Sequence, residues 1–179
     1  MDNETSGDPS VLLRPMGVSD EKQCLQAHEE LAQDDFEFLF DLDQGEPWPV
    51  YVERVENLRR GVDLPQDRVP ATFLLAEVEG EVVGRVSIRH ELNAYLLEVG
   101  GHIGYGVRPG FRRRGYATAI MRQSLAVAAS TGLERLLVTC DDDNIGSLTV
   151  IERCGGVLEN VVPFAGSSVP RRRYWVEVG

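Results

Sequence analysis

A strand, an arginine-rich loop and a helix follow one another between residues 102 and 131. The segment HIGYGV, residues 102–107, has the composition of a strand, and the stretch that begins at Gly115 repeats its apolar residues at helical spacing. Three consecutive arginines, residues 112–114, stand between the two. The first N–H groups of a helix are unpaired and its N-terminal end is positive, so arginines gathered there repel unless an anion binds. The pattern predicts an anion site at a helix start, with a solvated surface loop as the alternative.

Phosphate is the anion that suits this arrangement. A glycine lets the backbone approach the ligand, the N–H groups point at it, and arginines supply paired donors. Two other phosphate-binding loops are excluded by spacing. The sequence has no GxxxxGK(S/T) motif, and GYGVRPG (104–110) spaces its glycines as GxGxxxG, with no acidic residue where a ribose partner belongs. Neither a P-loop triphosphatase nor a dinucleotide-binding fold is therefore expected.

The composition is that of an ordinary globular protein. The 179 residues are 42% hydrophobic, and no apolar run reaches the length of a membrane span. The first ten residues hold neither the basic nor the apolar part of a signal peptide. The 3 cysteines and 3 histidines are scattered, without CxxC spacing. We therefore expect a cytoplasmic protein with no metal and no membrane partner, a flexible tail over residues 1–10 and a single domain over residues 11–179.

The net charge of −11 is unevenly spread along the chain. Residues 1–69 hold 17 acidic and 6 basic residues, whereas residues 70–179 hold 12 of each. Such a field repels nucleic acid except at one local site, so nucleic acid is not an expected partner. The acidic part is suited to attract a cation.

Hydrophobic periodicity predicts a mixed sheet with helices on both sides. In the hairpin around residues 79–81, Arg85, Ser87, Arg89 and Glu91 are expected on one face, opposite a face of Val82, Gly84, Val86, Ile88 and His90. Ser19 is expected to cap the first helix. The expected strands are 11–16, 71–78, 82–90, 102–107, 135–140, 157–162 and 172–178, and the expected helices are 19–33, 49–60, 115–131 and 144–154.

The six residues RRRGYA, 112–117, resemble the R/Q-x-x-G-x-G/A signature of the GCN5-related N-acetyltransferases, the GNAT superfamily. The context strengthens the resemblance, because the signature follows IGYGVRPGF and precedes an amphipathic helix, LLVTCDDDN and a helix that ends in GG. The clear resemblance covers residues 101–156, and the order of strands extends it to 71–178. The longer string is also similar to a subgroup known mainly as predicted acetyltransferases.

The resemblance implies an α/β (α+β) fold with a mixed, mostly antiparallel sheet whose central strands splay apart. Acetyl-CoA would be the cosubstrate, with its pantetheine arm in that gap. Asn144 matches a family position that contacts this arm, and the alternative is a plain N-cap. A homodimer is left open. The residues implied in binding acetyl-CoA are Tyr105, Gly106, Val107, Arg112, Arg113, Arg114, Gly115, Tyr116, Ala117 and Asn144.

The implied reaction needs a neutral amine, and deprotonating a lysine-like amine at pH 7 costs about 4.6 kcal/mol. A base, or a water chain that leads to one, is therefore expected. The candidates are Glu91, taken to lie beside the splay, His102 at the start of the fourth strand, and also His90 and Glu98.

For the acid, the family often places a tyrosine four residues after a serine on the last helix. Counting from Ser147 gives Ile151, so this chain departs from the pattern and Tyr105 is the substitute. Cys140 closes an apolar strand beside three aspartates and is expected to be a core thiol, not an acyl carrier.

The sequence thus predicts an N-acetyltransferase that moves an acetyl group directly to a cationic primary amine. The alternative is a non-catalytic domain that binds or senses CoA, which the missing tyrosine at position 151 would suit.

Overall fold

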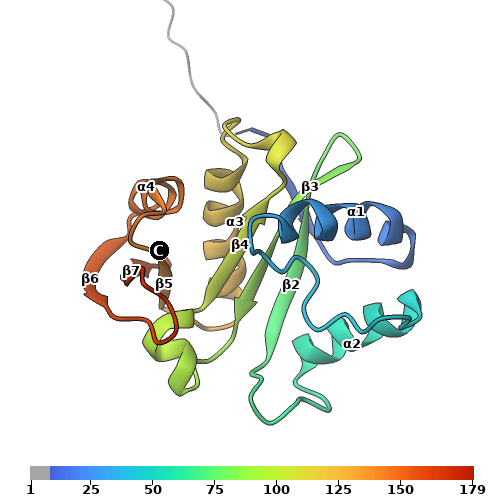
Figure 1. Cartoon of the computed structure of the whole chain (residues 1–179), viewed down its shortest axis with the longest axis horizontal. Helices are drawn as coiled ribbons and strands as arrows, with labels where there is room; N and C mark the ends of the chain where they lie inside the picture. The colour runs from blue at the N-terminus through green and yellow to red at the C-terminus, as the bar shows by residue number, and fades with distance from the viewer. Residues whose placement is uncertain (1–8) are drawn as a thin grey trace, which may run out of the picture.

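A seven-stranded sheet with the order β1-β2-β3-β4-β5-β7-β6 forms the centre of the molecule (Figure 1). The structure is a computed structural model that describes residues 9–179, so most of the predicted tail lies outside it. Neighbouring strands are antiparallel except β4 and β5. The strands are β1 (Leu12–Arg14), β2 (Ala71–Val78), β3 (Glu81–Arg89), β4 (Ile103–Val107), β5 (Arg135–Asp141), β6 (Val157–Val162) and β7 (Arg171–Glu177). The helices are α1 (Glu21–Ala32), α2 (Trp48–Arg60), α3 (Tyr116–Ser130) and α4 (Ile145–Arg153), and the short turns are η1 (Val18–Asp20), η2 (Leu96–Gly100) and η3 (Pro109–Phe111).

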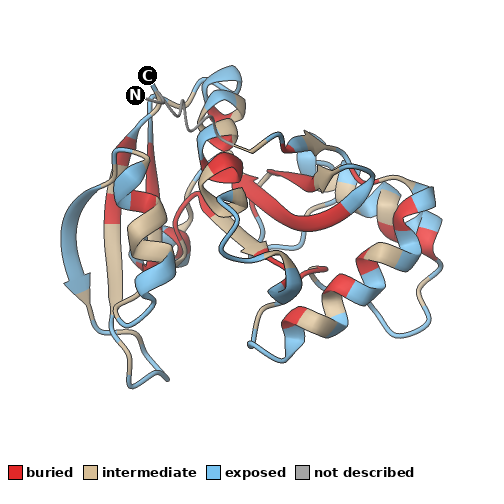
Figure 2. Cartoon of the chain, turned by 90° about the horizontal axis from the view of Figure 1, so that it is seen from above, coloured by how far each residue is buried: buried red, intermediate tan, exposed pale blue. Residues whose placement is uncertain are grey.

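Two apolar clusters cover the two faces of the sheet. One packs the apolar stripe of α3 against β3, β4, β5 and β7, with Ile151 of α4 among its buried members. The other joins α1 and α2 to β2 through residues such as Leu31, Tyr51 and Leu75. In Figure 2 the buried residues gather on the inner strands and the inner helix faces, while the edge strand β6 is almost wholly exposed. The predicted fold class, with helices on both faces, is confirmed.

β4 and β5 separate after a single registered pair, Ile103 opposite Val138. Just before this pair, the backbone N–H of His102 donates to the carbonyl of Leu137 at 2.7 Å. Gly101 makes the close approach possible, because it has φ of 67° and a Cβ there would lie 2.6 Å from the Leu137 oxygen. The two strands are therefore joined at their N-terminal ends and diverge toward their C-terminal ends. This confirms the predicted splay.

Two local expectations were wrong. Val82 packs with the α1 and α2 cluster, because the register of β2 and β3 shifts between Ala76 and Glu77 and one extra residue reverses the side-chain alternation. Ser19 does not cap the first helix. It lies inside a 3₁₀ turn, where the charged carboxylate of Asp20 accepts the N–H of Gly17 instead. None of the helices within residues 9–179 is long and apolar enough to cross a membrane.

Candidate active site

The arginine loop lies at the open end of the splay. β4 ends at Val107, the turn η3 follows, and α3 begins at Tyr116 with Gly115 as its N-cap. Gly115 has φ of 81°, a left-handed conformation that glycine adopts without steric cost. The first N–H groups of α3 lack partners inside the helix, so they can bind an anion at this end. The loop thus has the backbone geometry that the sequence predicted.

The three arginines of the loop are exposed but do not all point freely into solvent. Nε of Arg112 donates to the carbonyl of Val107 at 3.0 Å, and its Nη2 donates to the carboxylate of Asp34 at 2.6 Å. Arg113 has a left-handed backbone with φ of 65°, and Arg114 donates to the carbonyl of Gly110 at 3.0 Å. One of the three loop arginines, Arg112, therefore already has a carboxylate partner.

Arg108 is an organising residue that sequence reasoning missed. Its side chain is buried, donates two hydrogen bonds of 2.8 Å to the carboxylate of Glu30, and donates a third to the carbonyl of Val82. These bonds connect the end of α1 to the start of the arginine loop. Only its position directly after a strand could have signalled this role, because its partner lies far away in the sequence.

Tyr105 projects from β4 toward α4. Its phenol lies 3.2 Å from the hydroxyl of Ser147, and burial raises the pKa of Tyr105 to about 12. The backbone N–H of Ser147 in turn donates to the side chain of Asn144 at 3.0 Å, so the N-cap role considered for Asn144 is confirmed. Ile151, at the position where the family often has a tyrosine, is fully buried. Tyr105 is thus the phenol that the fold places between β4 and α4.

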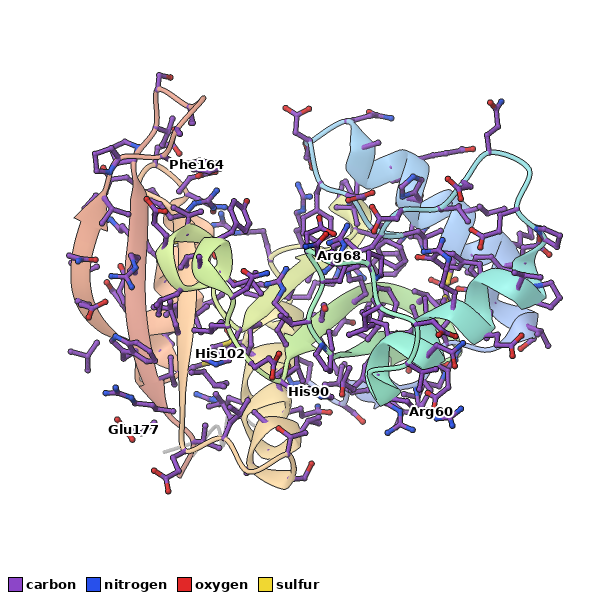
Figure 3. The ribbon with its side chains drawn as sticks, turned by 90° about the horizontal axis from the view of Figure 1, so that it is seen from below. Arg60, Arg68, His90, His102, Phe164 and Glu177 are labelled. Carbon is purple, nitrogen blue, oxygen red and sulfur yellow. The ribbon has the colours of Figure 1, made fainter. Side chains whose placement is uncertain are left out.

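The ring of His102 does not suit a base. Its Nδ1 accepts the backbone N–H of Leu137 at 2.9 Å, which leaves the proton of the neutral ring on Nε2. Burial lowers the pKa of His102 to about 4. The ring therefore fastens β4 to β5 at the closed end of the splay. Figure 3 shows His102 where the two parts of the sheet meet and His90 nearer to Arg60 of α2.

The other candidates for the base lie away from the opening. Because β3 runs antiparallel to β4, with Ile88 opposite Ile103, the exposed Glu91 lies near the closed end, and its expected place beside the splay was wrong. His90 is half-buried, with its Nε2 2.8 Å from the hydroxyl of Thr72, and burial lowers its pKa. Glu98 is exposed on η2. The described residues place no candidate carboxylate or imidazole directly beside Tyr105.

Cys140 is buried in the cluster beneath α3. Burial raises the pKa of Cys140 to about 11, so the thiol is neutral and a weak nucleophile near neutral pH. This confirms the expectation of a core thiol. Within residues 9–179, no three histidine, cysteine or carboxylate side chains group closely enough to hold a metal ion.

A cavity of about 560 Å³ lies on the opposite face of the sheet, toward α2. The chain segments that form it are α2, residues 62–69, β2, β3 and the region of η2. Phe73, Ser87 and Arg89 form its floor on the sheet. Deeper in the same layer, Arg85 is buried against the rings of Phe36 and Phe40, 4.3 and 4.2 Å from their centres. The alternation of β3 predicted that the two arginines share this face.

Residues 25–156 match the family described as the acetyltransferase (GNAT) family. The acetyltransferase plu1384 of Photorhabdus laumondii is 32% identical over 130 residues, which are 68% of this chain and 79% of that protein. The microcin C7 self-immunity acetyltransferase MccE, solved with acetyl-CoA and AMP, has a TM-score of 0.70 at 16% identity and covers 93% of this chain and 92% of its own. An N-acetyltransferase from Staphylococcus aureus Mu50 has a TM-score of 0.67 at 13% identity, over 96% and 100% of the two chains. The chain therefore belongs to the acetyltransferase (GNAT) family.

Proposed function

We propose that the chain moves an acetyl group from acetyl-CoA directly to a primary amine, with residues 11–179 acting as one domain. The observation that carries this proposal is the opening between β4 and β5, which leads to the helix start at Gly115. Unpaired strand backbone suits the amides of a pantetheine arm, and a helix start suits a pyrophosphate. The MccE structure, which holds acetyl-CoA, has a similar fold and supports the proposal.

In this arrangement the pantetheine arm lies along β4 and bonds to the backbone at Tyr105, Gly106 and Val107. Asn144 keeps its Oδ1 on the helix cap and turns its NH₂ group to the arm. The pyrophosphate rests on the residues of the loop, Arg112, Arg113, Arg114, Gly115, Tyr116 and Ala117. Arg112 then exchanges part of its interaction with Asp34 for the phosphate.

Tyr105 serves as the general acid. The ammonium group first loses a proton to water, and the neutral amine nitrogen then attacks the thioester carbonyl carbon. The carbon–sulfur bond breaks, the leaving sulfur takes the phenolic proton, and water accepts the second proton lost by the nitrogen. Ser147 of α4 is hydrogen-bonded to the phenol, and Tyr105 regains its proton through this hydroxyl. Because the thiol pKa is about 8.5, protonating the thiolate contributes only about 2 kcal/mol at pH 7, so the acid assists the reaction without being essential.

Replacing Tyr105 by phenylalanine is therefore expected to lower kcat by at most about a hundredfold, the lower end for general acid–base catalysis. In the wild type, kcat/KM should not fall on the alkaline side below about pH 10, because a phenol with its pKa raised to about 12 keeps the proton it must donate. The measurement is the pH profile of both proteins, with Tyr51→Phe as a control that removes a buried hydroxyl on the other face. An unchanged kcat in Tyr105→Phe would exclude Tyr105 as the acid.

The acceptor is proposed to approach as a protonated, cationic amine. All of the net charge lies before residue 70, in the part of the chain that contains α1 and α2 and the wall of the cavity. Opposite charges speed the encounter of two molecules, and salt weakens this effect.

A non-catalytic domain that binds CoA is the second candidate function. The buried Ile151 favours it, because a domain that only binds CoA needs no acid at that position. Such a domain would keep the loop at Gly115 and bind acetyl-CoA without releasing CoA.

A further inference from the structure

Arg89 lies on the floor of the cavity without a carboxylate partner among residues 9–179. Its Nη1 donates to the carbonyls of Gly100 and Gly101 at 3.3 and 3.2 Å. Its Nε and Nη2 donate to no described protein atom and keep contact with solvent. Other arginines of the fold do have carboxylate partners, among them Arg14, Arg54, Arg68, Arg108 and Arg112.

Arg85 adds a second positive charge that forms no ion pair with a carboxylate among residues 9–179. It donates only to the carbonyls of Glu37, Phe38 and Gly104, and the charge of Arg89 adds to burial in lowering its pKa to about 9, which still leaves it charged at pH 7. Burying a charge without a counter-ion is unfavourable, and two such charges on one face of β3 leave a positive potential in the cavity floor. An anion bound in the cavity would reduce this positive potential.

The remaining lining limits the kind of anion. The floor adds the hydroxyl of Ser87, a second hydrogen-bond donor on the same face of β3. The rim carries the exposed carboxylates of Glu53, Asp63 and Asp67, and its two arginines, Arg54 and Arg68, are already paired with Glu46 and Asp41. Such a site suits a molecule with an anionic end, an apolar body and a cationic group. The apolar lining includes Val50, Val55, Leu58, Leu64, Phe73 and Leu96.

The cavity floor also borders β4, the strand that flanks the splay. A Cβ placed on Gly104 would lie 3.5 Å from Nη2 of Arg89, and Gly104 is paired with Ser87 across the two strands. Because Nη2 of Arg89 lies against β4, a carboxylate bound there holds the neighbouring α-amine of an amino acid beside this strand. An acceptor amine must lie beside β4 to reach an acetyl group held in the splay.

We propose that the cavity is the acceptor site and that Arg89 binds a carboxylate of the acceptor, which is an amino acid with an apolar side chain. The inference rests on the proposed function, because only the transfer reaction requires an amine at β4. Arg89 takes the carboxylate through Nε and Nη2, in the paired geometry that guanidinium and carboxylate groups share. The acceptor then carries both charges: its ammonium group is drawn by the acidic rim, and its carboxylate by the floor.

The test is calorimetric binding of product-like ligands: the N-acetyl derivatives of leucine, methionine and phenylalanine, each against its amide. The wild type should bind at least one acid about tenfold or more tightly than its amide, since a charge-assisted pair is worth about 1.5 kcal/mol or more. Arg89→Met should lose this preference. Arg68→Met, which removes a cavity arginine that already pairs with Asp41, should keep it.

Equal affinity for acid and amide, no binding of any acid, or a preference that survives in Arg89→Met would each overturn the inference. The unfolding midpoint and the affinity for acetyl-CoA are measured for each variant. They distinguish a variant that no longer binds the ligand carboxylate from one that no longer folds. Arg89→Lys keeps a single charge and should restore part of the preference. Because binding needs no turnover, failure of acetyl transfer would overturn the proposed function and leave this readout intact.

Discussion

Replacing Arg85 by methionine is expected to lower the free energy of unfolding by about 3 kcal/mol or more, since each unpaired buried polar group costs about 1–3 kcal/mol. The side chain is 2% exposed and donates to the carbonyls of Glu37, Phe38 and Gly104. Methionine keeps an apolar stem of similar length against the surrounding rings, so the loss reports mainly on the three carbonyls left without a donor. Through these three hydrogen bonds, Arg85 connects the segment after α1 to β4.

Denaturant unfolding measures this effect, and Arg68→Met provides the matched control. Arg68 is exposed and pairs with Asp41 at the surface, where an ion pair contributes about 0–1 kcal/mol. If the free energy of unfolding of Arg85→Met lies within about 1 kcal/mol of the wild type, the three carbonyls have found other donors. This result would contradict the stabilising role given to Arg85.

Replacing Gly115 by valine is expected to weaken acetyl-CoA binding by about a hundredfold, the equivalent of two charge-assisted hydrogen bonds of about 1.5 kcal/mol. Gly115 has φ of 81°, which a β-branched residue adopts only with strain. A Cβ there would also lie 3.3 Å from Cδ of Pro9, so Pro9 or the helix start must move by a few tenths of an ångström. The N–H groups that face the pyrophosphate would move with it.

Calorimetric titration of acetyl-CoA measures this loss, with Gly110→Ala as the control in the same loop. Gly110 has no left-handed backbone, and a Cβ placed there meets nothing within 4 Å. The control should bind like the wild type. If Gly115→Val also binds like the wild type, the pyrophosphate does not rest on this helix start.

Much of the cofactor side was predictable because its signal is local. The strand, the arginine loop and the amphipathic helix are consecutive in the sequence, and Gly115 marks the position where the backbone must turn. The family resemblance on residues 112–117 was confirmed for the same reason. The boundaries of β2 and β5 also agree closely with the predicted ranges, since both have a strong apolar pattern, and α2 agrees as closely although its apolar pattern is weaker.

The cavity side was less predictable because it is assembled from distant segments. Alternation along β3 placed Arg85 and Arg89 on one face, but nothing local indicated that Phe36 and Phe40 would cover that face. The partner of Arg108, Glu30, is equally remote. The expected place of Glu91 was wrong because the direction in which the splay opens depends on the pairing of β4 with β5, which no single segment encodes.

Release of CoA from acetyl-CoA, followed over a panel of primary amines with purified protein, shows whether the chain transfers an acetyl group. We expect release that depends on the amine, is accompanied by an N-acetylated product detected by mass spectrometry, and, for acceptors with a net positive charge, slows as salt screens the acidic part of the chain. Acetyl-CoA binding without release of CoA for any amine in the panel would contradict it and identify a CoA-binding domain.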